Sequence, residues 1–290
     1  MFIVKYKSIF ITLSIILVIV SLFAVSKFGI KKGIDFTGGT VIETSYVTDM
    51  PESLDLKAFN DIGVSVYKTG EKSYKFVSTS DYDTMSKQIQ PLVTQGRYMY
   101  LENQVTNVGP TLGAEMTKKA IIAIVIVVLA ILLFIAFAFR EVSYPVSSWK
   151  YGTVAMVTLI HDIIIPTGIY VWLSKTQGAQ VDTLFIIALL TILGISISDK
   201  IVVFDRIREN LKLSSNKTVF SEVVGKSLRQ TFTRSINTSV TVILALVALY
   251  IFGPVSTKFF ALTLTFGMIV GTYSSIFVAS PLLTIWNSKK

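Results

Sequence analysis

The residues of this chain that could do chemistry are ionisable groups set inside apolar sequence. The clearest is Asp199, which follows Ser196 and Ser198 and precedes Lys200 in the stretch ISISDKIVVF. A carboxylate in hydrocarbon costs about 2.5–3.5 kcal/mol on insertion scales, so it must face protein or water, find a cation or bind a proton. Each of these outcomes indicates a functional site. In the alternative interpretation the span ends early, and both charges lie at the membrane interface with the lysine reaching toward water.

Helix geometry separates Asp199 from the lysine beside it. Ile195, Ser196 and Val202 lie on the same side of a helix as Asp199, whereas the next residue is rotated by about 100° around the axis. We therefore expect that Lys200 need not pair with Asp199.

A second acid, Asp162, lies near the middle of another apolar run, beside His161 and four residues before Pro166. Because proline has no N–H, the carbonyl of residue 162 loses its helical partner, and water or a hydroxyl must replace it. An acid beside such a turn indicates a proton path. The alternative is a paired polar group that packs helices together near a proline kink, and His161 alone favours a structural role.

A cation, Arg234, opens a later apolar run within the polar stretch RQTFTRSINTS. A guanidinium is always charged, so it can hold a neighbouring carboxylate ionised and release it by moving away. The alternative is an ordinary anchor at the inner membrane surface. Taken together, Asp199, Asp162 and Arg234 predict a proton pathway, with His161, Lys200, Ser196 and Ser198 as secondary groups.

The elements that must position these groups are membrane-spanning helices. Of the 290 residues, 52% are hydrophobic, which is too many for an ordinary soluble domain. The apolar runs predict six spans, at about 9–25, 120–139, 152–173, 183–204, 236–252 and 259–286. The first could instead be a signal peptide cleaved after Ala24-Val25-Ser26. Small residues in the last span, Gly267 and Gly271 among them, predict close helix packing.

The net charge of +9 comes from the membrane part, because residues 27–119 hold 11 basic and 11 acidic residues against 16 and 7 elsewhere. This distribution argues against a nucleic-acid partner and indicates that the basic residues set the orientation of the spans in the membrane. A cytoplasmic N-terminus places most short-loop cations inside, leaving Lys175 and Lys258 outside. The inner cations are Lys5, Lys7, Arg140, Lys150, Arg206, Arg208, Lys212, Lys217, Lys226, Arg229, Arg234, Lys289 and Lys290.

We therefore predict three parts: a first span with a short cytoplasmic N-terminus (1–26), an extracytoplasmic domain (27–119), and five spans with cytoplasmic loops and tail (120–290). Hydrophobic alternation in the middle part predicts the order βαββαβ, which is the ferredoxin-like arrangement, and a binding or lever function. The charged stretch DRIREN after the fourth span predicts an amphipathic helix along the inner membrane surface.

Several chemistries are excluded by what the sequence lacks. With no cysteine and one histidine, we expect no metal site, no cofactor and no disulfide. The glycines of GIDFTGGT are not part of a GxxxxGK[ST] loop, and neither GxSxG nor HExxH occurs, which argues against nucleotide binding and against an intramembrane protease. We predict that the chain is not an enzyme.

Several motifs together resemble the SecF family, the smaller subunits of the SecD/SecF accessory complex of the bacterial protein translocase. The motifs, in the family's order, are GIDFTGGT (33–40), VGPTLGAEM (108–116), HD (161–162), GISISDKIVVFDRIREN (194–210), RQTFTRSINTS (229–239) and GTYSSIFVASPL (271–282). The resemblance covers nearly the whole chain.

The resemblance implies a resistance-nodulation-division type of bundle that pairs with SecD, with the proton as coupling ion. It implies that the proton-motive force helps unfolded preproteins leave the SecYEG channel, with SecA using the ATP. It also implies that Asp199 and Arg234 are proton-pathway residues. The family usually has Asn-Asp-Thr where this chain has Ser198-Asp199-Lys200, so the lysine could perturb the acid or pair with it. The alternatives are half of a proton-driven lipid or drug exporter of the same fold and a purely structural subunit.

Overall fold

A computed structural model describes residues 2–47, 54–96, 98–138, 147–214 and 218–287. The chain forms two compact units. The first, the helical bundle, comprises residues 1–29, 124–173 and 184–290, and the second, the sheet unit, comprises 30–123 and 174–183. Arg140, Lys217, Lys289 and Lys290, which contributed to the predicted topology, lie outside the described residues.

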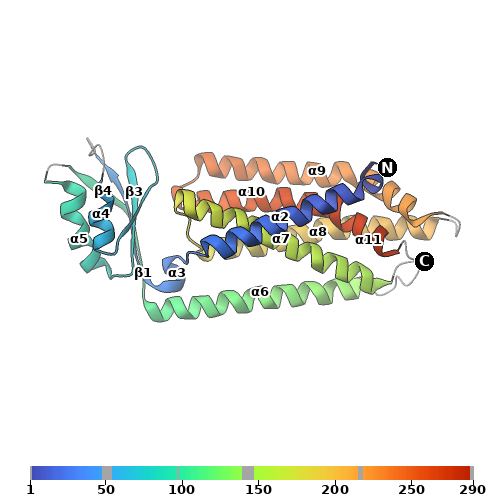
Figure 1. The fold of residues 1–290 in the computed structure, drawn as a ribbon, viewed down its shortest axis with the longest axis horizontal. Coiled ribbons are helices and arrows are strands. Elements are labelled where there is room, and N and C mark those ends of the chain that lie inside the picture. Colours follow the sequence, from blue (N-terminus) through green and yellow to red (C-terminus); the bar gives the residue numbers. More distant parts are fainter. Residues whose placement is uncertain (1, 48–53, 97, 139–146, 215–217, 288–290) are drawn as a thin grey trace. The chain divides into compact units, whose positions relative to one another are not determined.

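Long helices make up the bundle, and within the described residues six helical segments are long and apolar enough to cross a membrane, which confirms the six predicted spans. The elements are α1 (Phe2–Lys5), α2 (Lys7–Phe28), α6 (Pro110–Ala138), α7 (Ser148–Gln177), α8 (Thr183–Leu213), α9 (Phe220–Phe252), a 3₁₀ turn (Val255–Thr257), α10 (Lys258–Ser274), a π-helical segment (Ser275–Ala279) and α11 (Ser280–Asn287). Figure 1 shows α9 and α10 running side by side.

Two of these helices are longer than predicted. α8 continues without a break through DRIREN to Leu213, so the prediction of a separate helix along the membrane surface is wrong. The stretch contains no glycine or proline that would end the helix. α9 begins at Phe220 instead of near residue 236. Its hydroxyls bond to carbonyls one turn back, as Ser227 does with Val223 at 2.8 Å, so a polar stretch stays helical.

Close helix packing occurs where the sequence has small residues. A methyl group on Gly267 would lie 2.2 Å from the Ile192 side chain, and one on Gly271 would lie 3.2 Å from Ser196, so α10 approaches α8 closely, as predicted. A methyl on Gly168 of α7 would lie 2.4 Å from Ser21 of α2.

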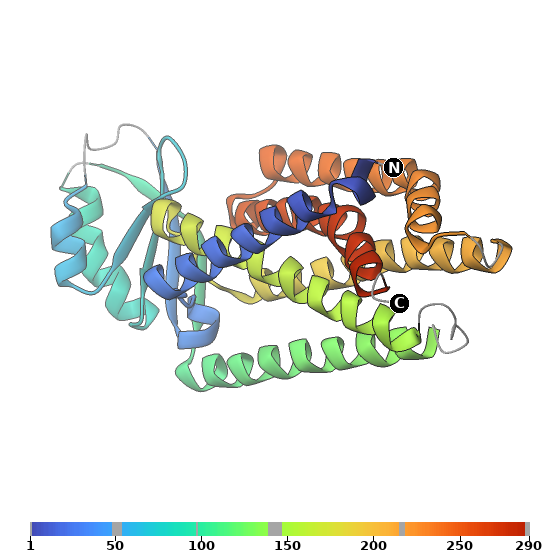
Figure 2. The same ribbon diagram turned by 45° about the vertical axis from the view of Figure 1, so that its right-hand side comes forward.

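The sheet unit has the predicted βαββαβ order. Its elements are β1 (Gly39–Tyr46), α4 (Leu56–Asp61), β2 (Ser65–Lys68), β3 (Ser73–Ser78), α5 (Tyr82–Thr94) and β4 (Tyr100–Val108). The strands form one four-stranded sheet in the order β2-β3-β1-β4, with every neighbouring pair antiparallel. α4 and α5 cover one face of it (Figure 1 and Figure 2).

The core of the sheet unit lies between the sheet and these two helices. Phe59 of α4 and Ile89 of α5 pack there with Phe76 of β3, and none of the three is exposed. Tyr46 of β1 donates a hydrogen bond from its phenol to the carbonyl of Val93 at 3.0 Å. Burial, reinforced by neighbouring tyrosines, raises the pKa of Tyr46 to about 12.

A segment distant in sequence completes the sheet unit. Residues 174–183, which comprise the end of α7, the connection to α8 and the first residue of α8, join the stretch that includes α3 (Ile34–Thr37). Lys32 forms a parallel bridge with Val181, and the N–H of Gly33 donates to the Val181 carbonyl at 2.7 Å. Asp35 Oδ2 accepts from the N–H of Thr183, the first residue of α8, at 2.9 Å. This compact unit therefore differs from the predicted segment 27–119, since local patterns carry no signal for such docking.

Candidate functional site

Asp199 lies in α8 with its side chain half-buried. Its Oδ1 accepts a hydrogen bond of 2.5 Å from the Ser235 hydroxyl of α9, and its Oδ2 accepts one from the Ser275 hydroxyl at the start of the π-helical segment. Both serines are buried. Within the described part of the chain, no ammonium or guanidinium lies within 4.0 Å of this carboxylate, so its bonded partners are neutral hydroxyls.

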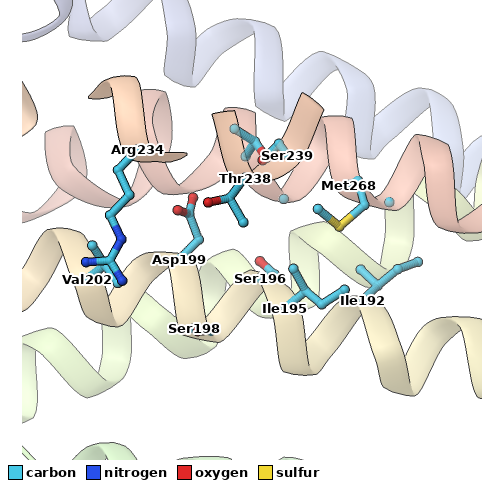
Figure 3. Close-up of a pocket in the computed structure, with 13 residues that line it drawn as sticks. Ile192, Ile195, Ser196, Ser198, Asp199, Val202, Arg234, Thr238, Ser239 and Met268 are labelled. Carbon is cyan, nitrogen blue, oxygen red and sulfur yellow. The ribbon is translucent and has the colours of Figure 1, made fainter. Parts of the chain in front are cut away.

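Asp199 and Arg234 line one pocket of about 180 Å³, which we call the acid pocket. Figure 3 shows the guanidinium extending from α9 toward Val202, beside the carboxylate but without an ion pair to it in the described structure. Arg234 is exposed and also borders a second pocket of about 410 Å³. That pocket, which we call the charged pocket, is lined further by Asp205, Arg206, Arg208 and Glu209. Arg234 thus borders both the acid pocket and a pocket whose two acids are paired with two other arginines.

Asp162 of α7 is completely buried and accepts four hydrogen bonds. Its Oδ2 receives the Lys200 ammonium at 2.5 Å and the hydroxyls of Ser196 at 2.5 Å and Ser274 at 2.9 Å. Its Oδ1 lies 2.9 Å from Nδ1 of His161. The predicted acid therefore lies in a dense cluster of donors from three helices, α7, α8 and α10.

Lys200 is also completely buried, and it pairs with Asp162 instead of Asp199. Its ammonium additionally donates to the Ser196 hydroxyl at 2.5 Å. The predicted rotation of Lys200 away from Asp199 is confirmed. His161 is buried as well, and its Nε2 has no hydrogen-bond partner among the described residues. We call His161, Asp162 and Lys200, with Ser196 and Ser274, the ion-pair cluster.

The acid pocket and the ion-pair cluster are built from consecutive residues. Asp199 and Lys200 follow each other on α8, and Ser274 and Ser275 follow each other where α10 becomes π-helical. Lys200 pairs with Asp162, and its neighbour Asp199 is the acid of the acid pocket. Ser274 donates to Asp162, and its neighbour Ser275 donates to Asp199. Single π-helical turns inside α-helices occur frequently at functional sites.

The structure divides the predicted site residues between these two places. Asp199 and Arg234 line the acid pocket, where Ser198 is exposed and forms no hydrogen bond that the structure describes. His161, Asp162, Lys200 and Ser196 form the ion-pair cluster, and Ser196 also lines the acid pocket. The hydrogen bonds of Ser235, Ser274 and Ser275 to the two acids were not predicted, because the sequence suggested a polar helix entry for Ser235 and helix packing for Ser274 and Ser275. The sequence feature that could have indicated these contacts is the pair of adjacent serines, Ser274 and Ser275, within an apolar run.

Comparisons with known proteins place these features in a family. Residues 88–289 match the family model described as "Protein export membrane protein SecD/SecF, C-terminal", and residues 23–50 match the "SecD/SecF GG Motif". "Protein translocase subunit SecF" of Thermobaculum terrenum is 37% identical over 99% of this chain and 94% of its own length. The subunit of the same name from Anaerolinea thermophila is 35% identical over 97% and 92%.

Among solved structures, the crystal structure of SecDF, a translocon-associated membrane protein from Thermus thermophilus, aligns with a TM-score of 0.84 and 29% identity. The alignment covers 99% of this chain and 38% of the SecDF chain, so this chain spans well under half of that protein. Together with the six spans and the match over nearly the full length, these similarities show that the chain belongs to the SecF family of protein translocase subunits.

Proposed function

We propose that this chain couples the proton-motive force to protein export as the partner of a SecD-type subunit. In this proposal the pair assists the SecYEG channel and helps unfolded preproteins complete their passage after SecA has used ATP, with the proton as coupling ion and no other cofactor. The observation that carries the proposal is Asp199, an acid half-buried in a spanning helix, held by two hydroxyls and bordering a pocket shared with a guanidinium.

The hydroxyl partners of Asp199 suit a group that alternates between two protonation states. A serine hydroxyl carries one donor and two acceptor lone pairs. Ser235 and Ser275 can therefore donate to the carboxylate, and either can rotate to accept from the carboxylic acid. Asp199 thus keeps hydrogen-bond partners in both states without a rearrangement of the backbone.

Arg234 supplies a charge that can respond to the state of Asp199. A carboxylate in the acid pocket attracts the guanidinium, and a protonated carboxyl releases it toward the charged pocket, where Glu209 is paired with Arg206 and Asp205 lies 3.8 Å from Arg208. Each elementary charge that crosses the membrane field supplies about 2.3 kcal/mol per 100 mV. A few protons per cycle therefore suffice to shift a conformational equilibrium of a few kcal/mol.

The sheet unit is in this proposal a ferredoxin-like module on the outer side of the bacterial cytoplasmic membrane, with both chain termini in the cytoplasm. α8, which carries Asp199, begins within the sheet unit, where Asp35 accepts from the first N–H of the helix. Because α8 is continuous from Thr183 through Asp199, a shift of this helix that follows proton exchange also moves its first residue, and in this proposal the sheet unit then acts on the emerging preprotein. The predicted participation of Asp162 in the proton pathway stays a prediction.

Export in cells tests the proposal. In bacteria depleted of their own SecF-type subunit, this chain is expressed with its cognate SecD-type partner, and the ratio of preprotein to mature protein is measured. Asp199→Asn keeps the size and polarity of the side chain but cannot ionise, so preprotein should accumulate as in depleted cells. Glu222→Gln, which removes an exposed acid of α9, is the control and should export normally. Normal export by Asp199→Asn would refute the proposal.

A further inference from the structure

We propose that Lys200 is a permanent counter-charge for Asp162, and that this ion pair positions Asp199 without exchanging protons itself. The inference rests on the proposed function, in which Asp199 gains and loses a proton. It assigns the pair a positioning role, which differs from the proton path that the sequence predicted for Asp162.

The donors around Asp162 favour one charge state. Its carboxylate accepts from Lys200, Ser196, Ser274 and His161, and neither Asp162 nor Lys200 is exposed. An ammonium has donors only, so it cannot turn to accept a hydrogen bond from a protonated carboxyl. A proton on Asp162 would leave the Lys200 charge buried without a counter-charge. The pair is therefore expected to stay ionised while Asp199 titrates.

His161 completes a cluster with no net charge. When its Nδ1–H donates to Asp162, Nε2 carries a lone pair, and this nitrogen has no partner among the described residues. A second proton would create a buried N–H donor without an acceptor, so the neutral ring is favoured. With His161 neutral, the charges of Asp162 and Lys200 cancel. The ionisable groups that line the acid pocket are Asp199 and Arg234.

The pair can position Asp199 because the two places share helical turns. Lys200 ties α8 to α7, and Ser274 ties α10 to α7 through the same carboxylate. The adjacent residues are Asp199 and Ser275, which form the contact in the acid pocket. A displacement of the ion pair would therefore move both partners of that contact.

Infrared difference spectra between neutral and acid pH, recorded on the complex with the SecD-type partner, test this inference. A buried carboxyl that binds a proton gains a carboxylic-acid carbonyl band, and differences between variants assign the band to a residue. In wild type, the band of the carboxyl in the acid pocket should disappear with Asp199→Asn, whereas the bands of the exposed acids should remain. In absolute spectra at acid pH, Lys200→Met should show a second carboxylic-acid band, because Asp162 without its counter-charge binds a proton, and adding Asp162→Asn to this variant should remove that band.

The double variant Asp162→Asn/Lys200→Met tests positioning without leaving a buried charge. It should keep the Asp199 band but move its pH midpoint, since the contact with Ser275 is displaced. An unchanged midpoint would overturn the positioning role. Absence of a second band in Lys200→Met, or a wild-type band that survives Asp199→Asn and is lost in the double variant, would overturn the permanent ion pair. Normal export by Asp199→Asn, with the spectra as expected, would instead refute only the proposed function.

Discussion

The ion pair between Asp162 and Lys200 makes a prediction about stability that separates it from a surface salt bridge. Both side chains are completely buried, and their charged atoms lie 2.5 Å apart. Breaking a buried pair by removing one partner costs about 3–5 kcal/mol, because the other charge is left uncompensated. We expect a loss in this range from Lys200→Met and from Asp162→Asn. Replacing both partners by neutral groups of similar volume is often close to neutral, so the double variant should lose less than either single variant.

The pH dependence of the two single variants should have opposite signs. Lys200→Met leaves a carboxylate that can escape its burial cost by binding a proton, so its loss of stability should shrink as the pH falls. Asp162→Asn leaves an ammonium that can escape by losing a proton, so its loss should shrink as the pH rises.

Reversible unfolding in mixed micelles, followed by the fluorescence of the three tryptophans, measures these free energies. Additive losses, with the double variant costing about the sum of the two single variants, would refute the reasoning. Equal losses at all pH values would refute it as well, since they would show that neither charge is held uncompensated in the single variants.

Further predictions concern other parts of the chain. Gly168→Ala should cost about 1–3 kcal/mol, because its methyl would overlap the neighbouring helix at 2.4 Å. Gly194→Ala, with nothing within 4 Å, should be neutral or stabilise by up to about 1 kcal/mol in thermal unfolding. Asp35→Ala removes the acceptor of the Thr183 N–H and should speed amide hydrogen exchange in the first turn of α8, at a local cost of about 0.5–2 kcal/mol. Alkaline titration of tyrosinate absorbance should show Tyr46 ionising at about pH 12. Because this pKa lies above the usual 10, the neutral Tyr46 phenol contributes to the free energy of unfolding fully below about pH 10. This contribution is lost as the pH rises to about 12, and the pH dependence is absent in Tyr46→Phe.

Each of these predictions has a result that would contradict it. Equal melting temperatures for the two glycine variants would show that α2 and α7 do not pack closely. Asp61→Ala, which removes an exposed acid at the end of α4, is the control for Asp35→Ala, and equal exchange in the two would show that Asp35 does not hold α8. No difference between the titrations of wild type and Tyr46→Phe above pH 10 would show that the phenol is not held by burial.

Local patterns in the sequence predict much of this fold. The six spans follow from long apolar runs, and the βαββαβ order follows from alternating and helical hydrophobic periods. The rotation of Lys200 away from Asp199 follows from helix geometry alone. These features depend on residues that are near one another in sequence, which is why periodicity detects them.

The arrangement of the site depends on contacts that local patterns do not encode. Asp162 meets Lys200 and Ser274 across 38 and 112 positions of sequence, and Asp199 meets Ser235 and Ser275 across 36 and 76. Which acid receives the cation depends on how three helices pack. The docking of residues 174–183 on the sheet unit escaped prediction for the same reason.

Proton-driven movement of a preprotein in reconstituted vesicles tests the central claim most directly. Vesicles holding the channel, the SecD-type partner and this chain are loaded with a preprotein arrested in the channel, ATP is removed, and a proton-motive force is imposed. If proton exchange on Asp199 does the work, wild type completes transport and Asp199→Asn shows only the rate seen without the force. Completion by Asp199→Asn at the wild-type rate would contradict the claim.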